Sequence, residues 1–322
     1  MQTQQQRNGL GRWVWSAATA LIILALGYVV LRQLDWAEIY RAISQADFKW
    51  AVIAASSIIL GQTVRLWRAW RLMQRGGTLA WGDVVRATLG AQVINWLSPL
   101  RVGDVWRIWQ LRQQQHAGVI WSALAILVEK SLDSVVLALI ALTLLLLPTP
   151  PNINSTLIRL AMVACAGALL LSVLLVLRPG MLQRQLAGRF PVLVEWGLRW
   201  PETNAHETLF PPREIVLAAF ASALMWGLAA LTNIALAQAF HIAWAGWMIP
   251  LLIVSIQTVS IVSPIPGNIG VIPLVTIGVL ALGGVPTALG MAHGTLHYLL
   301  VYGINLVWFL LMQLGNRDRL TL

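Results

Sequence analysis

Long runs of apolar residues fill most of the chain and predict membrane-spanning helices. A helix needs about 20 apolar residues to cross a hydrocarbon core of about 30 Å. Runs that we assign as full spans cover residues 13–31, 50–64, 121–147, 157–177, 215–240 and 289–314. The first run is long, abuts Arg32 and shows no clear cleavage site after it, so we expect an uncleaved anchor rather than a secretory signal. The pattern predicts an all-α polytopic membrane protein with about six full transmembrane helices.

Two further apolar segments, at about residues 82–112 and 251–282, are interrupted by turn-forming residues. The first breaks at SPL, residues 98–100, and the second breaks within SPIPGNIGVIP, residues 263–273. Each leg of the second segment has about 12 residues, which at 1.5 Å per residue is too short for a full crossing. We therefore expect two re-entrant broken-helix hairpins, the first entering from the cytoplasm and the second from the outside face.

The placement of basic residues supports this topology. With the N-terminus in the cytoplasm, almost all of the 22 Lys and Arg residues fall on the cytoplasmic side. The exceptions are Arg32, Arg41, Lys49 and Arg159 outside and Lys130 within a span. A complete crossing by residues 82–100 would place Arg101, Arg107 and Arg112 outside, against this bias. Since Lys and Arg are enriched in cytoplasmic loops, we expect both termini to be cytoplasmic.

Composition agrees with an integral membrane protein. The chain is 58% hydrophobic and only 11% charged, which is too apolar for a single water-facing globule. Its net charge of +10 is therefore assigned to topology and to attraction of anionic lipids, and not to nucleic acid. The single cysteine, Cys165, excludes a disulfide or thiolate metal cluster within one chain. Residues 1–322 are expected to form a single membrane domain, with residues 181–200 as a helix on the cytoplasmic surface.

The two interruptions resemble each other in sequence. SPL at residues 98–100 and SPI at residues 263–265 share a Ser-Pro-aliphatic start, with glycines a few residues on. Each serine suits a helix N-cap followed by proline in the first turn, and Gly267 and Gly270 permit positive φ. Broken backbone at membrane depth must be covered by protein or face water, so the breaks predict a cavity. Entry from opposite faces predicts inverted repeats meeting near the midplane, as in many transporters; two kinked helices are the alternative.

Three ionisable residues lie within the run at residues 121–147: Glu129, Lys130 and Asp133. Burying each charge costs about 2.5–3.5 kcal/mol, so these residues need partners or water. Glu129 and Asp133 share a helix face, and Lys130 is three residues from Asp133 and can pair with it. This face could balance Arg101 and Arg107, bind a cationic headgroup or carry a proton, and a purely architectural ion-pair network is the alternative. Asp104 could face the same cavity or pair with Arg101 or Arg107.

His293 and His297 lie at i and i+4 in the last run, a spacing that can bind a metal. No acidic or cysteine ligand lies near them in the sequence. We therefore expect packing or polar contacts between helices, with the same role for Asn233 and Asn305.

Three motifs carry a resemblance to a known family. NWLSPLRVGDVWR at residues 95–107, EKSLD at residues 129–133 and SPIPGNIG at residues 263–270 resemble the transmembrane flippase-like family, which includes the membrane part of lysylphosphatidylglycerol synthase, the multiple peptide resistance factor. The resemblance covers nearly the whole chain and implies movement of a phospholipid or related lipid between leaflets. The family's second loop usually reads PGGLG followed by an acid, whereas Asn268 and Pro273 occupy these places here. The soluble aminoacyl-transferring domain is not recognised in this sequence, so lipid aminoacylation is not expected.

The leading functional prediction is a lipid translocase, and not an enzyme, that moves a phospholipid or polyprenyl-type headgroup through a polar groove. The alternatives are a non-transporting partner of a lipid-modifying enzyme and a membrane-embedded polyprenyl-sugar transferase. We expect anionic membrane lipids as partners, a bacterial cytoplasmic (inner) membrane location, and no cofactor or metal; a homo-oligomer or a partner lipid-modifying enzyme stays open. The expected substrate-binding residues are Asn95, Ser98, Arg101, Asp104, Arg107, Glu129, Lys130, Asp133, Ser263, Gly267, Asn268 and Gly270.

Overall fold

The computed structural model describes six stretches of the chain. These are residues 36–74, 77–98, 102–115, 118–147, 210–263 and 265–314. The predicted spans at 13–31 and 157–177, the surface helix at 181–200, and the single residues Pro99, Arg101 and Pro264 lie outside the described residues. Within those stretches all regular structure is helical, which confirms the predicted all-α class.

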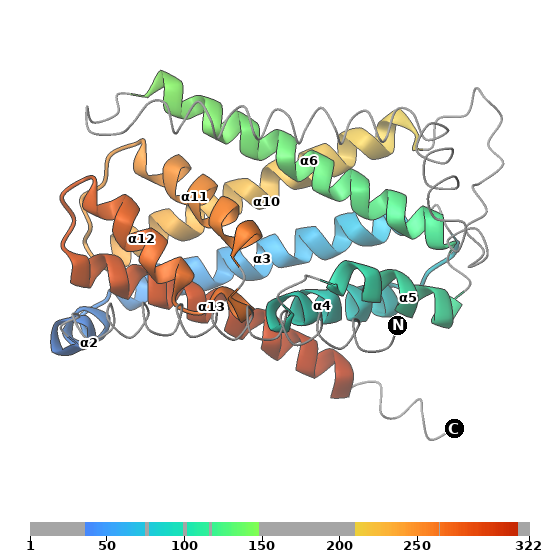
Figure 1. Ribbon diagram of the computed structural model, residues 1–322, viewed down its shortest axis with the longest axis horizontal. Helices are drawn as coiled ribbons and strands as arrows, with labels where there is room; N and C mark the ends of the chain where they lie inside the picture. Colours follow the sequence, from blue (N-terminus) through green and yellow to red (C-terminus); the bar gives the residue numbers. More distant parts are fainter. Residues whose placement is uncertain are drawn as a thin grey trace, which may run out of the picture.

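Except across residues 148–209, which lie outside the described part of the chain, the described helices are joined by short connections. They are α2 (Trp36–Ser44), α3 (Phe48–Met73), α4 (Trp81–Leu97), α5 (Gly103–Gln115), α6 (Val119–Leu146), α10 (Pro212–Ala239), α11 (Met248–Val262), the 3₁₀ turn η2 (Pro266–Asn268), α12 (Val271–Ala281) and α13 (Thr287–Leu314). The long helices α3, α6, α10 and α13 run along the longest axis of the molecule, as Figure 1 shows. The short helices α4, α5, α11 and α12 pack against them.

Among the residues that the structure describes, three helices, α3, α10 and α13, are long and apolar enough to cross a membrane. They occupy the runs predicted at residues 50–64, 215–240 and 289–314. The fourth predicted run in the described residues forms α6, whose 28 residues include the charged motif at residues 129–133. These helices make the chain a membrane protein.

Helix α3 is longer than its apolar run. It begins after Asp47, whose side chain accepts a hydrogen bond from the backbone N–H of Lys49 at 2.9 Å, and it continues to Met73. Sequence analysis ended this run at Val64, before the first of several arginines. The extension is stable because two of those arginines, Arg68 and Arg71, reach carboxylates on neighbouring helices.

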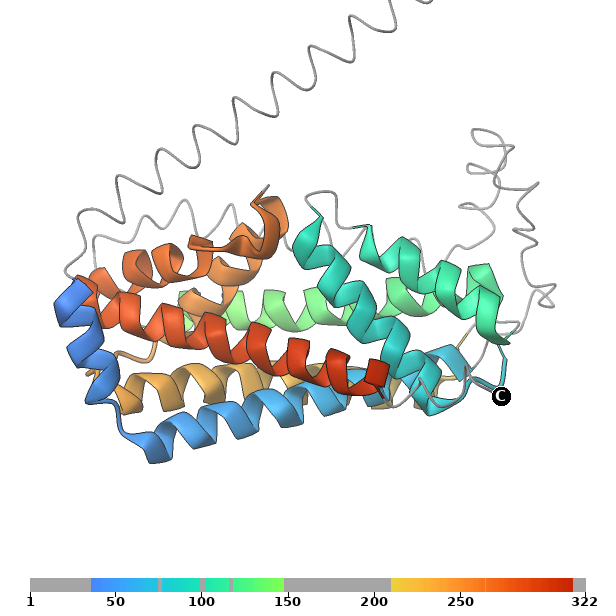
Figure 2. The same ribbon diagram turned by 90° about the horizontal axis from the view of Figure 1, so that it is seen from below.

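The two interrupted segments form helical hairpins. Helix α4 packs on α5, and α11 packs on α12. Figure 2 shows the hairpins extending from opposite ends of the bundle, and the end of α4 contacts η2 near the middle of the bundle. There the ring of Trp96, from the end of α4, lies 4.5 Å from the ring of Tyr302 on α13, and Tyr302 stacks on Tyr298 at 4.3 Å.

Glycine is required at one position in each hairpin. In the first, a Cβ atom on Gly103 would lie 2.0 Å from the backbone oxygen of Ala91, so the close approach of α5 to α4 depends on its absence. In the second, Gly267 has a φ of 66° and lies under the hydroxyl of Tyr298. Asn268 follows it with a φ of 52°, a conformation that asparagine tolerates better than most residues.

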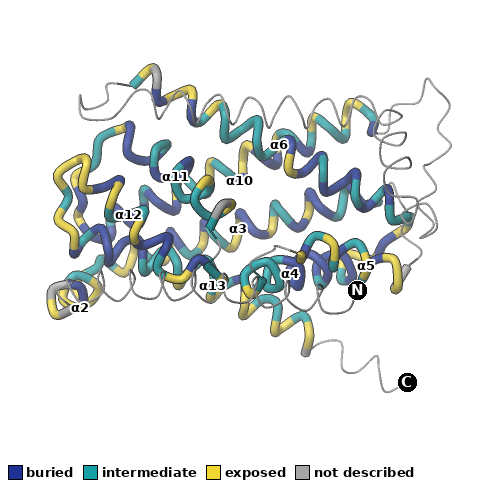
Figure 3. The backbone as a smooth tube through the Cα atoms, in the orientation of Figure 1, coloured by how far each residue is buried: buried dark blue, intermediate teal, exposed yellow. Residues whose placement is uncertain are grey.

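Two hydrophobic clusters hold the hairpins to the long helices. One joins α4, α5 and α6 to α3 and α10 through residues such as Leu72, Leu111 and Leu124. The other joins α11, α12 and α13 to α6 and α10 and includes Met248 and Leu280. Figure 3 shows buried residues on the inner sides of both hairpins and exposed residues along the outer sides of α6 and α13.

Candidate functional site

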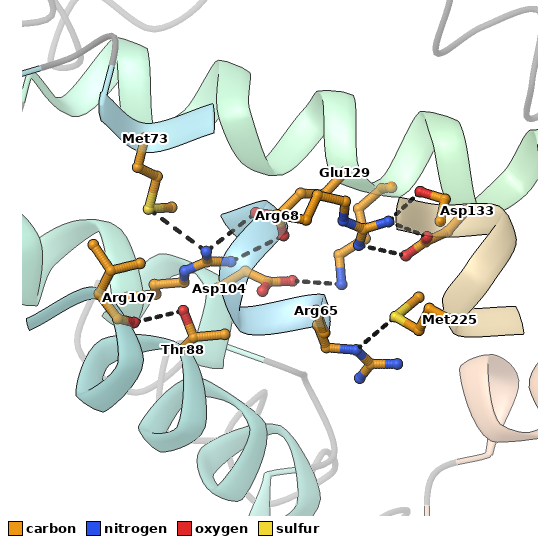
Figure 4. A network of polar contacts seen from close by, with 12 residues as sticks. Arg65, Arg68, Met73, Thr88, Asp104, Arg107, Glu129, Asp133 and Met225 are labelled. Carbon is orange, nitrogen blue, oxygen red and sulfur yellow. Dashed lines mark hydrogen bonds and ion pairs between the residues drawn. The ribbon is translucent and has the colours of Figure 1, made fainter. Parts of the chain in front are cut away.

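Arg107 on α5 and Glu129 on α6 form a buried ion pair. The two terminal guanidinium nitrogens lie 3.1 and 3.2 Å from the two carboxylate oxygens, and the side chains are only 3% and 7% exposed. One of these nitrogens also lies 3.5 Å from the sulfur of Met73 (Figure 4). This two-pronged geometry uses the fork of arginine and both oxygens of the acid. The charge of Arg107 is therefore already balanced within the protein.

Asp133, one turn further along α6, binds an arginine from another helix. Arg68 on α3 places its terminal nitrogens 2.5 and 3.1 Å from the two carboxylate oxygens (Figure 4). The same side chain donates a hydrogen bond to the hydroxyl of Ser222 on α10. Arg68 is buried, whereas Asp133 is partly exposed. This pair connects α3, α6 and α10.

Lys130 forms the third ion pair, at the edge of the cluster. Its ammonium nitrogen lies 3.5 Å from a carboxylate oxygen of Asp104 on α5, and the two side chains are 59% and 35% exposed. Lys130 therefore pairs with Asp104 and not, as the sequence had suggested, with Asp133, and the alternative of Asp104 with Arg107 is wrong because Arg107 binds Glu129. The alternative of Asp104 with Arg101 stays a prediction, since Arg101 lies outside the described residues. Adjacent helical residues point about 100° apart, so Lys130 faces away from α3 while Glu129 and Asp133 face inward.

The serines of both breaks occupy different places from those predicted. Ser98 and Ser263 were expected to cap the following helices, but each is the residue after a helix, α4 or α11. The next described α-helices begin at Gly103 and Val271, and the 3₁₀ turn η2 lies between Ser263 and Val271. The hydroxyl of Ser263 accepts a hydrogen bond from the N–H of Ile265 at 3.2 Å and so shapes the turn.

Other predicted residues hold the turns in place. The side-chain oxygen of Asn95 accepts a hydrogen bond from the N–H of Gly103 at 2.8 Å, which links the legs of the first hairpin. The side-chain nitrogen of Asn268 lies 3.5 Å from the hydroxyl of Tyr302. Gly270 has a φ of 76° at the start of α12. The predicted site residues thus form two groups, a charged cluster around α6 and a set of residues at the two hairpin turns.

Comparison with protein families agrees with this architecture. The model of the lysylphosphatidylglycerol synthase transmembrane region matches residues 15–310, which include both hairpins and the three ion pairs of α6. The chain belongs to this family. The comparison with curated proteins finds no match. Membership in the lysylphosphatidylglycerol synthase transmembrane family confirms the resemblance inferred from the three motifs and indicates a lipid-related membrane function.

Two arginines near the charged cluster were not predicted as site residues from the sequence. Arg65 and Arg68 were treated as cytoplasmic flanking residues, yet both lie within α3. Arg68 is the partner of Asp133, and Arg65 lines a half-open cavity. The signal that could have found Arg68 is the excess of acids in α6, because two inward carboxylates need two cations and Arg107 supplies only one.

A polar contact joins α10 to α13, as the sequence predicted. Asn233 accepts through its side-chain oxygen from a ring nitrogen of His297 at 3.0 Å, and its backbone oxygen lies 3.3 Å from a ring nitrogen of His293. Hydrogen bonds of this kind commonly hold transmembrane helices together. Among the residues that the structure describes, no three His, Cys, Asp or Glu side chains gather as metal ligands would.

Proposed function

We propose that this protein is a lipid translocase that moves the headgroup of a phospholipid or polyprenyl-type lipid between leaflets. The observation that carries the proposal is the meeting of two broken-helix hairpins beside a cluster of buried charges. Family membership supports a lipid as the cargo. The acyl chains would stay in the bilayer while the headgroup follows the polar residues.

In this proposal both hairpins are re-entrant. Helix α5 has 13 residues and α12 has 11, so they extend about 20 and 17 Å, well short of a hydrocarbon core of about 30 Å. The hairpins extend from opposite ends of the bundle, which favours inverted repeats. In this proposal the protein lies in the inner membrane of a bacterium, with both termini in the cytoplasm. Non-helical chain at this depth is stable when it faces protein or water, which a headgroup path would supply.

The headgroup path would follow the side of α6 that carries its charges. Exposure rises from the enclosed Arg107–Glu129 pair through Asp133 to the open Lys130–Asp104 pair. A headgroup can exchange contacts most easily with the exposed members. Arg107 would hold the hairpin to α6, and we propose Arg101, from its place in the first motif, as a phosphate ligand.

Transport fits better than group transfer. In the described residues, both inward acids of α6 are bound by arginines, which leaves neither carboxylate free for acid–base chemistry. The same closed ion pairs would also suit a non-transporting partner of a lipid-modifying enzyme. This second candidate predicts no lipid movement by the purified protein.

Reconstituted vesicles test the proposal. Protein is incorporated into liposomes that carry fluorescent lipids with different headgroups, and dithionite then bleaches label in the outer leaflet. A translocase increases the bleached fraction for at least one headgroup relative to protein-free vesicles. Folded protein that accelerates none of them would contradict the proposal and favour the partner role.

A further inference from the structure

We propose that a cavity beside Arg65, between α3, α10 and α13, binds the phosphodiester of a lipid whose headgroup also carries a hydroxyl or amine. This assignment of a lipid rests on the proposed translocase function. The cavity itself rests on the geometry of these three helices. It lies outside the ion pairs described above.

Arg65 is the arginine of α3 that forms no direct ion pair with an acid among the described residues, although Asp133 and Glu129 lie near enough to favour its charge. Arg68 binds Asp133 and Arg71 binds Glu214, but Arg65 donates through Nε to the sulfur of Met225 at 3.2 Å. Its terminal nitrogens point away from the Arg68–Asp133 pair (Figure 4). The forked end of Arg65 is therefore available for an acceptor-only group such as phosphate.

The position of Arg65 within α3 makes this charge unusual. It lies six residues before Arg71, or about 9 Å deeper along the helix axis from the Met73 end. An ionisable side chain at such depth faces a polar interior or a water-filled space far more often than lipid. A charge kept at this depth without a direct ion pair fits a site that an anion occupies.

A half-open cavity with a mainly apolar lining lies at this arginine. Its volume is about 120 Å³, far above the roughly 15 Å³ that a single water requires. All three helices contribute polar lining residues, which are Ser57, Gln62, Arg65, Thr232, His297 and Asn305. Gln62 also donates to the side-chain oxygen of Gln92 on α4 at 3.2 Å, which connects the cavity to the first hairpin.

Asn305 supplies the second half of the recognition. Its side-chain nitrogen donates to the backbone oxygen of Val301 at 2.7 Å. A carbonyl can only accept, so this bond directs the amide nitrogen toward Val301 and leaves the side-chain oxygen without a partner. Asn305 is 5% exposed, and an unpaired oxygen so deeply buried is costly unless a donor reaches it.

The terminal nitrogens of Arg65 and the unpaired side-chain oxygen of Asn305 define the ligand chemistry. Arg65 offers donors and positive charge, which suit a phosphate, and Asn305 offers an acceptor, which suits a hydroxyl or an ammonium. Glycerol and ethanolamine headgroups carry both a phosphate and a donor. A choline headgroup carries the phosphate but no hydroxyl or N–H donor. Inorganic phosphate lacks the acyl chains of a lipid.

Binding to the purified full-length protein in a neutral detergent tests the site. The probes are dihexanoylphosphatidylglycerol, dihexanoylphosphatidylcholine and inorganic phosphate. The wild-type protein should bind the glycerol lipid most tightly, and Arg65→Gln should weaken that binding by about tenfold or more, because a charged hydrogen bond is lost. Asn305→Leu should remove the preference for the glycerol lipid over the choline lipid. Lys49→Gln removes one exposed charge from the same helix and should change nothing.

A second measurement keeps both recognition residues intact. In a Cys165→Ser background, Ala229→Cys places a thiol in the cavity lining. The glycerol lipid should slow its alkylation by N-ethylmaleimide, and inorganic phosphate should do so only weakly. Equal protection by phosphate would assign the site to free anions and overturn the lipid assignment. If the glycerol lipid does not protect the thiol, and Arg65→Gln binds this lipid as tightly as the wild-type protein does, the proposed site is wrong.

The outcomes separate this site from the proposed function. Loss of lipid binding in Arg65→Gln, with no transport by the wild-type protein, would keep the site and reject translocation. Normal binding and normal transport in folded Arg65→Gln would keep translocation and reject the site.

Discussion

Glu129 and Asp133 lie one turn apart on α6, and each is held by an arginine from a different helix. Arg107 comes from the first hairpin and Arg68 from the long helix α3. One side of α6 therefore fixes the hairpin relative to the long helices. Since both arginines use two nitrogens, small rotations of either helix would break the pairs.

Breaking the buried pair should cost much more stability than breaking the exposed pair. Glu129→Gln leaves the enclosed charge of Arg107 without a counterion, which should destabilise the protein by about 3–5 kcal/mol. Asp104→Asn removes the exposed partner of Lys130 and should cost less than about 1 kcal/mol. Unfolding in detergent, followed by tryptophan fluorescence, measures both changes. Similar losses from the two variants would contradict the buried geometry.

The pairing scheme itself predicts which substitutions are coupled. In a double-mutant cycle, Arg107→Met and Glu129→Leu should show an interaction energy of about 1–3 kcal/mol, since the two residues share one network. Arg107→Met and Asp104→Asn should be additive to within about 0.5 kcal/mol. The free energies of unfolding of the wild-type protein, the three single variants and the two double variants give both values. Coupling of Arg107 to Asp104, with none to Glu129, would contradict the ion pair between Arg107 and Glu129.

Run length predicted the main helices because burial in a membrane demands continuous apolar sequence. The helical class, α10, α13 and the two interrupted segments follow from that demand. The continuation of α3 does not, because Asp133, the acid that neutralises Arg68, lies 65 residues away in the sequence. The identity of an ion-pair partner depends on packing, which no local pattern reports.

The hairpins also show which features the sequence could not predict. Serine and proline at each break indicated where the helices stop. They did not indicate where the next helix starts, since Gly103 begins α5 only where its missing side chain lets the legs touch. That contact is set by Ala91 on the opposite leg. The chemistry of Asn305 was also missed, because its unpaired oxygen is visible only in three dimensions.

Gly103→Ala should disrupt the first hairpin. The added Cβ would lie 2.0 Å from the backbone oxygen of Ala91, so the two legs must separate. We expect a loss of about 1–3 kcal/mol, as for other overpacked sites. Gly227→Ala is the matched control, because nothing lies within 4 Å of its added Cβ and alanine favours a helix. Thermal unfolding in detergent should show a lower midpoint for the first variant and an equal or higher midpoint for the second.

The contact between the hairpin turn and α13 should matter for lipid movement. Trp96→Ala removes the ring that lies on Tyr302, where the two turns meet. Aromatic pairs contribute about 0.5–1.5 kcal/mol beyond buried area, so the turns should lose their fixed spacing. We expect an altered transport rate in the vesicle assay. Trp109→Ala, an exposed tryptophan on α5, should transport at the wild-type rate, and equal rates for both variants would argue against a role for the turns.

Arg101→Ala should abolish lipid movement while leaving expression intact. Arg101 follows Pro99 by two positions in the motif NWLSPLRVGDVWR, and a guanidinium can bind phosphate through two hydrogen bonds. Arg107 cannot take over this role, because Glu129 occupies both of its terminal nitrogens. Arg112→Ala removes an exposed arginine further along α5 and should transport normally. Full activity of folded Arg101→Ala would move the phosphate site elsewhere and leave Arg65 as the arginine to test.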